Sequence, residues 1–147
     1  MKIFLATDHA GVDHKNALRH YLVEKGMDVE DMGTDSTESC DYPDFIMPAA
    51  RAVAEDPENR RAFVFGGSGQ GEAMTANRVK GVRATTYYHH DLDILELSRS
   101  HNGANILSIG ARFVSVEEMK EAADKWLGMN EALEERHARR VAKIDTV

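Results

Sequence analysis

The chain has 147 residues, of which 42% are hydrophobic and 29% are charged, and its formal net charge is −7. These values predict one globular domain with one hydrophobic core, covering residues 1–147. The negative charge argues against a nucleic-acid partner, which requires a basic face. The only cysteine is Cys40, so the sequence excludes both an intrachain disulfide and a thiolate zinc site.

The amino-terminal segment MKIFLATDHAG reaches polar residues after a few apolar positions, too few for the core of a signal peptide. No apolar run approaches the roughly 20 residues that cross a bilayer. We therefore expect a cytoplasmic protein that does not bind membranes.

Short apolar runs alternate with longer amphipathic segments along the chain. The sequence predicts five strands, over residues 3–6, 27–32, 62–65, 82–87 and 105–109, of which the first is a buried apolar run. The amphipathic segments predict helices between them: one ending at Gly26, one beginning at Pro43, one over 72–80, one over 92–101, one opened by a capping box at Ser115 and Glu118, and a last one over about 130–145. This alternation predicts an α/β fold, a Rossmann-like three-layer α/β/α sandwich with a five-stranded parallel sheet. Ligands of such folds bind beyond the carboxyl ends of the strands.

The strongest local signal is the glycine-rich segment FVFGGSGQGE, residues 63–72, where a predicted strand meets a predicted helix. Backbone amides left bare by glycine at such a junction bind an anionic oxygen well. A turn without a ligand is the simpler alternative, although glycine at this density costs stability. A dinucleotide-binding loop also stays open, with Asp91 as the ribose-binding acid, but the spacing is G-x-G-x-G rather than G-x-G-x-x-G.

Glu72 follows this loop directly in the first turn of the predicted helix. Alone, it would be interpreted as a carboxylate that complements the helix dipole. Beside a loop that can hold an oxyanion, the same carboxylate becomes a candidate general base. Ser68 is an ordinary turn residue when considered alone, but it offers one hydroxyl to the same space.

Six short motifs follow one another along the chain: Thr7-Asp8-His9-Ala10-Gly11, Asp41-Tyr42-Pro43, Gly67-Ser68-Gly69-Gln70-Gly71-Glu72, Ser98-Arg99-Ser100-His101-Asn102, Ile109-Gly110-Ala111-Arg112 and Arg136-His137-Ala138-Arg139-Arg140-Val141. Each is weak alone, but their order and spacing resemble the ribose-5-phosphate isomerase B family, which includes galactose-6-phosphate isomerase subunits. The resemblance covers nearly the whole chain. It implies an enzyme that interconverts ribose 5-phosphate and ribulose 5-phosphate without a metal ion or other cofactor.

The resemblance also indicates the catalytic base. Many members of the family carry a cysteine base at the position of Gly66, whereas Cys40 of this chain lies in a different loop. The other subgroup has the pattern G-G-S-G-x-G-E and uses its final glutamate, which corresponds to Glu72. Such a base moves a proton from C2 to C1 through an enediolate. The amides of Gly67, Gly69, Gln70 and Gly71 and the Ser68 hydroxyl would stabilise the enediolate oxygen.

The remaining site residues are likewise carried over from the family. It assigns opening of the sugar ring to His101, with Asp8 close by, and a hydrogen bond to the sugar to Asn102. Phosphate binding falls to the four basic residues His9, Arg112, Arg136 and Arg140, and Tyr42 would line the pocket. Without the family, these residues would be interpreted as caps, turns, packing residues and a solvated basic helix face. The pair His89-His90 lacks a third ligand and is not interpreted as a metal site.

One departure from the family lies just before Arg136. Many relatives have a glycine-rich turn there, whereas residues 131–135 read EALEE and predict a continuous helix. The added negative charge puts in doubt the placement of Arg136 and the length of the sugar accepted. Four-carbon and six-carbon sugar phosphates, such as erythrose 4-phosphate, allose 6-phosphate and galactose 6-phosphate, therefore remain alternatives, as does a non-catalytic sugar-phosphate sensor. The resemblance also implies a homodimer, or a tetramer, whose active sites take residues from both subunits.

Overall fold

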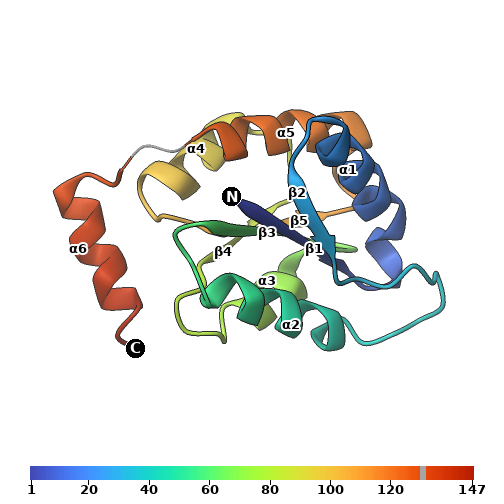
Figure 1. Ribbon diagram of the computed structural model, residues 1–147, viewed down its shortest axis with the longest axis horizontal. Helices are drawn as coiled ribbons and strands as arrows, with labels where there is room; N and C mark the ends of the chain where they lie inside the picture. The colour runs from blue at the N-terminus through green and yellow to red at the C-terminus, as the bar shows by residue number, and fades with distance from the viewer. Residues whose placement is uncertain (130–131) are drawn as a thin grey trace.

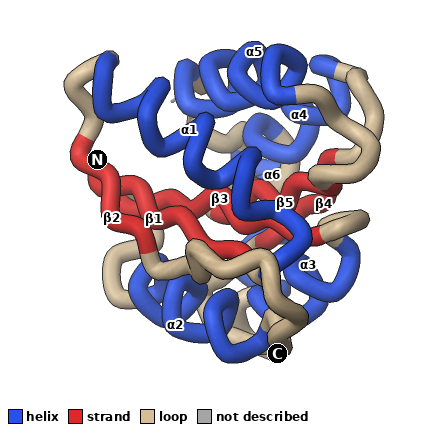
Figure 2. The backbone as a smooth tube through the Cα atoms, turned by 90° about the vertical axis from the view of Figure 1, so that its right-hand side faces the viewer, coloured by secondary structure: helices blue, strands red, loops and turns tan. Residues whose placement is uncertain are grey.

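The computed structural model describes residues 1–129 and 132–147. Its centre is a parallel sheet of five strands in the order β2-β1-β3-β5-β4. The strands are β1 (Lys2–Thr7), β2 (Asp28–Asp31), β3 (Arg60–Gly66), β4 (Ala84–Tyr87) and β5 (Ile106–Gly110). Figure 2 shows this sheet between two helix layers, which confirms the predicted three-layer sandwich.

Six α-helices and one short 3₁₀ helix connect and flank the strands in the described parts of the chain. They are η1 (His9–Gly11), α1 (Val12–Glu24), α2 (Pro43–Ala54), α3 (Gln70–Ala76), α4 (Leu92–Ser100), α5 (Val116–Gly128) and α6 (Glu135–Ile144). Helices α1, α4 and α5 cover one face of the sheet, and α2 and α3 cover the other. Among these residues no helix has the length and apolar character of a membrane span.

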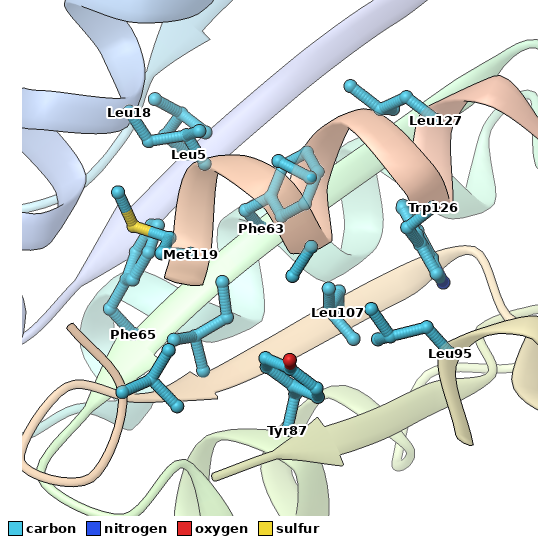
Figure 3. Close-up of a cluster of buried hydrophobic side chains, with 14 of the residues drawn as sticks. Leu5, Leu18, Phe63, Phe65, Tyr87, Leu95, Leu107, Met119, Trp126 and Leu127 are labelled. Atoms are coloured by element: carbon cyan, nitrogen blue, oxygen red, sulfur yellow. The ribbon is translucent and has the colours of Figure 1, made fainter. Parts of the chain in front are cut away.

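Each face of the sheet buries its own hydrophobic cluster. Figure 3 shows the larger one, in which Phe63 and Trp126 meet edge to face with ring centroids 5.4 Å apart. The smaller cluster packs Ile46 and Val53 of α2 against Val64 of β3. Because β1, β3 and β5 are buried on both faces, they are continuous apolar runs rather than alternating ones. This pattern made them recognisable from the sequence.

The helix expected over residues 72–80 is shorter than the sequence suggested. Helix α3 ends at Ala76, and turns follow up to Gly81, whose φ is +84°. The Asn77 side chain donates to the carbonyl of Ala84 at 2.9 Å and accepts from the amide of Ala84 at 2.7 Å. These two bonds to β4 redirect the chain where local propensity alone would have continued the helix.

The sequence also predicts a continuous helix across residues 131–135, and this prediction is wrong for residues 132–134. Residues 132–134 are not helical, and α6 begins at Glu135. Glu134 has an extended backbone (φ −56°, ψ 148°), and its carboxylate pairs with Arg136 at 3.0 Å. The predicted start of this helix, residues 130 and 131, lies outside the described residues.

Helix α6 lies at the amino ends of the strands. Asp145, just after the helix, pairs at 2.9 Å with Arg83, which immediately precedes β4. Figure 1 shows α6 on the far left and the loop that joins β2 to α2 on the far right. The two segments therefore flank opposite ends of the sheet.

Candidate active site

A cleft of about 500 Å³ opens where β1, β3 and β5 end. Its lining includes eight of the residues predicted from the sequence: Asp8, His9, Tyr42, Gly67, Ser68, Gly71, Glu72 and Arg112. Two further lining residues, Ala10 and Phe113, were not predicted. Phe113 is 62% exposed in the structure. The only signal for it in the sequence was an aromatic residue directly after the predicted site residue Arg112. The cleft occupies the carboxyl ends of the strands, where α/β folds bind ligands.

The Glu72 side chain lies across Gly66, the last residue of β3. A Cβ atom added at Gly66 would stand 2.0 Å from Oε1 of Glu72 and 2.4 Å from Oε2. Glu72 is only 4% exposed, and this burial raises the pKa of its carboxyl above the ordinary value. The charge of Asp8 acts in the same direction, while a hydrogen bond from the backbone of Glu72 itself opposes both. The glycine thus leaves space for a buried carboxylate with a raised pKa.

The loop that follows Gly66 turns sharply at Gly69, whose φ is +77°. A side chain there would be strained and would also come within 3.0 Å of the Ile109 backbone, so only glycine fits. The Ser108 hydroxyl donates to the Gly69 carbonyl at 2.6 Å and fixes the loop against β5. Gly69 and the exposed Gln70 do not line the cleft, in contrast to their predicted neighbours.

Asp8 and His9 follow β1 and are held by backbone contacts. Asp8 is 6% exposed and accepts the amide of Ala10 at 2.8 Å, capping η1. Nδ1 of His9 accepts the backbone amide of Cys40 at 3.3 Å. A neutral imidazole that accepts at Nδ1 carries its proton on Nε2. His9 therefore keeps an N–H donor free for an oxygen of a ligand.

Tyr42 and Arg112 each lie against a glycine of the loop. A Cβ atom at Gly71 would come within 2.7 Å of the Tyr42 ring, and one at Gly67 within 3.2 Å of the Arg112 guanidinium. Within residues 1–129 and 132–147, no carboxylate lies within salt-bridge distance of Arg112. Its guanidinium can therefore pair with a phosphate in the cleft.

The sequence analysis missed Lys15, which holds the loop leading to Tyr42. Lys15 is fully buried in α1, where its ammonium contacts the carboxylate of Asp31 and lies 2.9 Å from that of Asp35. These acids flank Gly33, whose added Cβ would come within 2.8 Å of the Lys15 side chain. The three charged side chains are distant in sequence, and nothing local in the chain signals their contact.

We predict that Lys15→Met lowers the free energy of unfolding by about 2–3 kcal/mol, because it removes the partner of the Asp31 carboxylate. That carboxylate is only 19% exposed, whereas the Asp35 side chain is 80% exposed. Urea unfolding followed by circular dichroism measures the change, and Asp35→Asn serves as the control, with a smaller loss. A Lys15→Met protein as stable as the wild type would contradict this role.

The other predicted site residues do not reach this cleft within one chain. His101 and Asn102 end α4 and precede β5, so they lie at the amino end of the sheet. Arg136 and Arg140 are exposed on α6 at the same end. The predicted site residues therefore form two separate groups in one chain, one at each end of the sheet.

The described residues contain no group of three or more His, Cys, Asp or Glu side chains placed to hold a metal ion. The pair His89-His90 was not predicted to bind a metal. The ring of His90 lies 3.4 Å from the Tyr87 hydroxyl and 3.6 Å from the Glu121 carboxylate.

Known proteins resemble this chain over nearly its full length. The model of the ribose/galactose isomerase family matches residues 3–144. Ribose-5-phosphate isomerase B of Escherichia coli is 36% identical over 99% of this chain and 95% of its own. The D-erythrulose-4-phosphate isomerase of Pectobacterium atrosepticum is 34% identical over 86% of this chain and 82% of its own.

The solved structures agree with this assignment. Ribose-5-phosphate isomerase B of Clostridium thermocellum superposes with a TM-score of 0.91 at 38% identity, covering 99% of this chain and 96% of that one. The sheet order, the cleft beyond its carboxyl ends and the full-length matches all lead to the same assignment. The chain belongs to the ribose/galactose isomerase family and is a sugar-phosphate aldose–ketose isomerase.

Proposed function

We propose that the protein interconverts ribose 5-phosphate and ribulose 5-phosphate, with Glu72 as the catalytic base. The observation that carries this proposal is the buried Glu72 carboxylate over Gly66, inside a cleft that also holds Arg112 and His9. A carboxylate in this position can exchange protons with a sugar carbon, while the arginine and the histidine bind its phosphate. The name of the Escherichia coli relative supports this substrate.

In the proposed reaction Glu72 takes the proton from C2 of the open-chain aldose. The electrons of the broken C–H bond form the enediolate, and the proton of the C2 hydroxyl moves to O1. The carboxyl then returns its proton to C1, and C2 becomes the carbonyl carbon of the ketose. The raised pKa of the Glu72 carboxyl lies closer to neutral pH than that of an ordinary glutamate. The carboxyl can therefore both take up and return the proton more easily. The Ser68 hydroxyl and the glycine loop face the same cleft and are placed to stabilise the enediolate oxygen. The proton transfer uses side chains only and requires no cofactor.

The test is ketose formation from ribose 5-phosphate by the purified protein in the presence of EDTA. Allose 6-phosphate, galactose 6-phosphate and erythrose 4-phosphate are assayed in parallel. Turnover of ribose 5-phosphate that survives the chelator supports the proposal. If the protein binds these sugar phosphates but turns over none of them, it is a sugar-phosphate sensor and not an enzyme.

A four-carbon substrate is the second candidate. The relative from Pectobacterium atrosepticum, named for D-erythrulose 4-phosphate, is 34% identical to this chain, close to the value for the ribose-5-phosphate relative. If kcat/KM is higher with erythrose 4-phosphate than with ribose 5-phosphate, the four-carbon sugar phosphate is the substrate. The proposal that Glu72 is the base would then still stand.

We further propose that the working enzyme is a homodimer in which each cleft is completed by a second copy. The half-site at the carboxyl ends of the strands contains the base and Arg112. The half-site at the amino ends contains His101 and Asn102, with Arg136 and Arg140 on α6. Under a two-fold axis, each end of one chain can meet the opposite end of the other, and α6 would contribute to both the interface and the phosphate site.

Shared sites predict complementation between two inactive variants. Glu72→Gln and His101→Asn chains, coexpressed with different tags, should recover about a quarter of wild-type turnover, because half of the dimers are mixed and each has one intact site. The unfractionated coexpressed protein is assayed beside each variant alone, and mixed dimers isolated on both tags should reach about half of wild-type turnover, because one of their two sites is intact. If each site came from one chain, every site would carry a substitution and no activity would return.

A further inference from the structure

The histidine expected to open the sugar ring does not stand alone. The ring of His101 stacks on that of His137, with centroids 4.1 Å apart and planes inclined by 14°. His101 caps the carboxyl end of α4, and His137 lies in the first turn of α6. The stack therefore joins the loop that carries His101 to the helix that carries the arginines of the half-site.

His137 faces inward, unlike its neighbours on α6. It is 5% exposed, whereas Arg136 and Arg140 are exposed. Burial lowers the pKa of His137, and the nearby His101, Arg136 and Arg140 lower it further, while Glu134 opposes them. Burial and these neighbouring cations therefore disfavour the charged form of the His137 imidazole.

The ring of His137 also lacks a polar partner in the part of the chain that the structure describes. Its Nε2 is buried without a hydrogen bond, and the Glu134 carboxylate is 3.9 Å away, too far for one. A buried polar atom without a partner costs free energy, so hydrogen bonding does not explain a histidine here. The contact that its ring does make is the parallel stack on His101.

Ring opening requires an oriented acid–base group. The C1–O4 bond of the furanose breaks as a proton reaches O4, and the O1 hydroxyl loses its proton as the aldehyde forms. We propose that His137 is a positioning residue, whose stacked ring holds the His101 imidazole in the orientation that opens the cyclic sugar phosphate. This inference rests on the proposed function, from which the role of His101 comes.

The two substrates separate this role from the chemistry of Glu72. Ribose 5-phosphate closes to a furanose through O4, whereas ribulose 5-phosphate would need O5, which carries the phosphate, and stays open. Exchange of a C1 proton of ribulose 5-phosphate with deuterium oxide thus requires the base but no ring opening. A positioning defect at His101 should slow turnover of the aldose and spare this exchange.

The experiment compares His137→Ala with His137→Phe, which restores a stacking ring without imidazole nitrogens. We expect His137→Ala to lower kcat with ribose 5-phosphate about 10-fold or more, since misplaced catalytic groups cost rates of this order. The C1 exchange rate should stay within about twofold of the wild-type rate, because Glu72 is unaffected. His137→Phe should recover most of the lost kcat, and Val141→Ala, on the same buried face of α6, is the control for loosened packing.

The outcomes distinguish the inference from the function on which it rests. If the wild-type protein neither turns over ribose 5-phosphate nor exchanges ribulose 5-phosphate, the proposed function fails. If it does both, the inference is overturned when His137→Ala slows both reactions equally or neither. It is also overturned when His137→Phe is as slow as His137→Ala, which would indicate a hydrogen bond in place of the stack, or when Val141→Ala produces the same selective loss.

Discussion

Replacement of Glu72 by glutamine is expected to lower kcat with the accepted sugar phosphate by at least about 10²–10⁴-fold, the usual contribution of a general base. The amide has nearly the shape of the carboxylate, so the cleft and the glycine loop should persist. The loss should appear in kcat, because phosphate contacts to Arg112 and His9 are made elsewhere in the cleft. Exchange of the substrate's C2 proton with solvent deuterium, followed by NMR, should disappear together with turnover.

The same variant should be at least as stable as the wild type at neutral pH. The folded state raises the pKa of Glu72, so folding favours the protonated form. Its stabilising contribution is present below the ordinary glutamate pKa and is lost as the pH rises through the raised value. Glutamine does not titrate. The stability of the variant relative to the wild type should therefore increase as the pH rises from the ordinary glutamate pKa to the raised pKa of Glu72, and then level off. Urea unfolding at several pH values measures this, and a variant that is both inactive and unfolded would contradict the assignment.

The wild-type pH profile provides an independent check on the base. Because the pKa of Glu72 is raised, the acid limb of kcat/KM should lie above the ordinary range of a glutamate. A limb at the ordinary value would point to a base in a more solvated position than Glu72.

Features set by local chemistry could be predicted from the sequence. The capping box of α5 forms as expected, with Ser115 Oγ accepting from the Glu118 amide at 3.2 Å and the Glu118 carboxylate accepting from the Ser115 amide at 2.8 Å. Strands β1, β3 and β5 were recognisable because double burial requires unbroken apolar runs. Seven of the eight predicted residues that line the cleft follow the ends of β1, β3 and β5, and the eighth, Tyr42, lies on the loop between β2 and α2.

Features set by distant contacts could not be predicted in this way. The end of α3 depends on the bonds between Asn77 and Ala84, and the loop before Tyr42 depends on buried Lys15. No periodicity or spacing encodes either contact. Likewise, His137 belonged to a recognised motif, but its stack on His101 requires the packing of α6 beside the end of α4. Nor did the sequence show that the predicted site residues lie at opposite ends of the sheet, which follows from the direction of α4 across the sheet.

The physical reason for glycine at position 66 became clear only from the structure. In the sequence Gly66 marks a subgroup, whereas in the structure it leaves the volume that the Glu72 carboxylate occupies. We expect Gly66→Ala to reduce kcat/KM by about 10²-fold or more, since the new methyl group displaces the base from its reactive position. The clash involves the end of a flexible side chain, so the unfolding temperature should change little. Gly128→Ala, where an added Cβ meets nothing within 4 Å, is the matched control for both measurements.

A thiol at position 66 would occupy the volume that the Glu72 carboxylate fills, so it could act as a base in place of that carboxylate. Glu72→Ala should therefore be inactive, and adding Gly66→Cys to it should restore part of the turnover. The optimum should move to higher pH, because a free thiol has a pKa of about 8.5. With Cys40, the chain's own free thiol beside His9, replaced by serine in both proteins, iodoacetamide should abolish the restored activity and leave the rate of the Glu72 enzyme unchanged. An active Gly66→Ala protein together with an inactive double variant would show that the base acts from another part of the cleft.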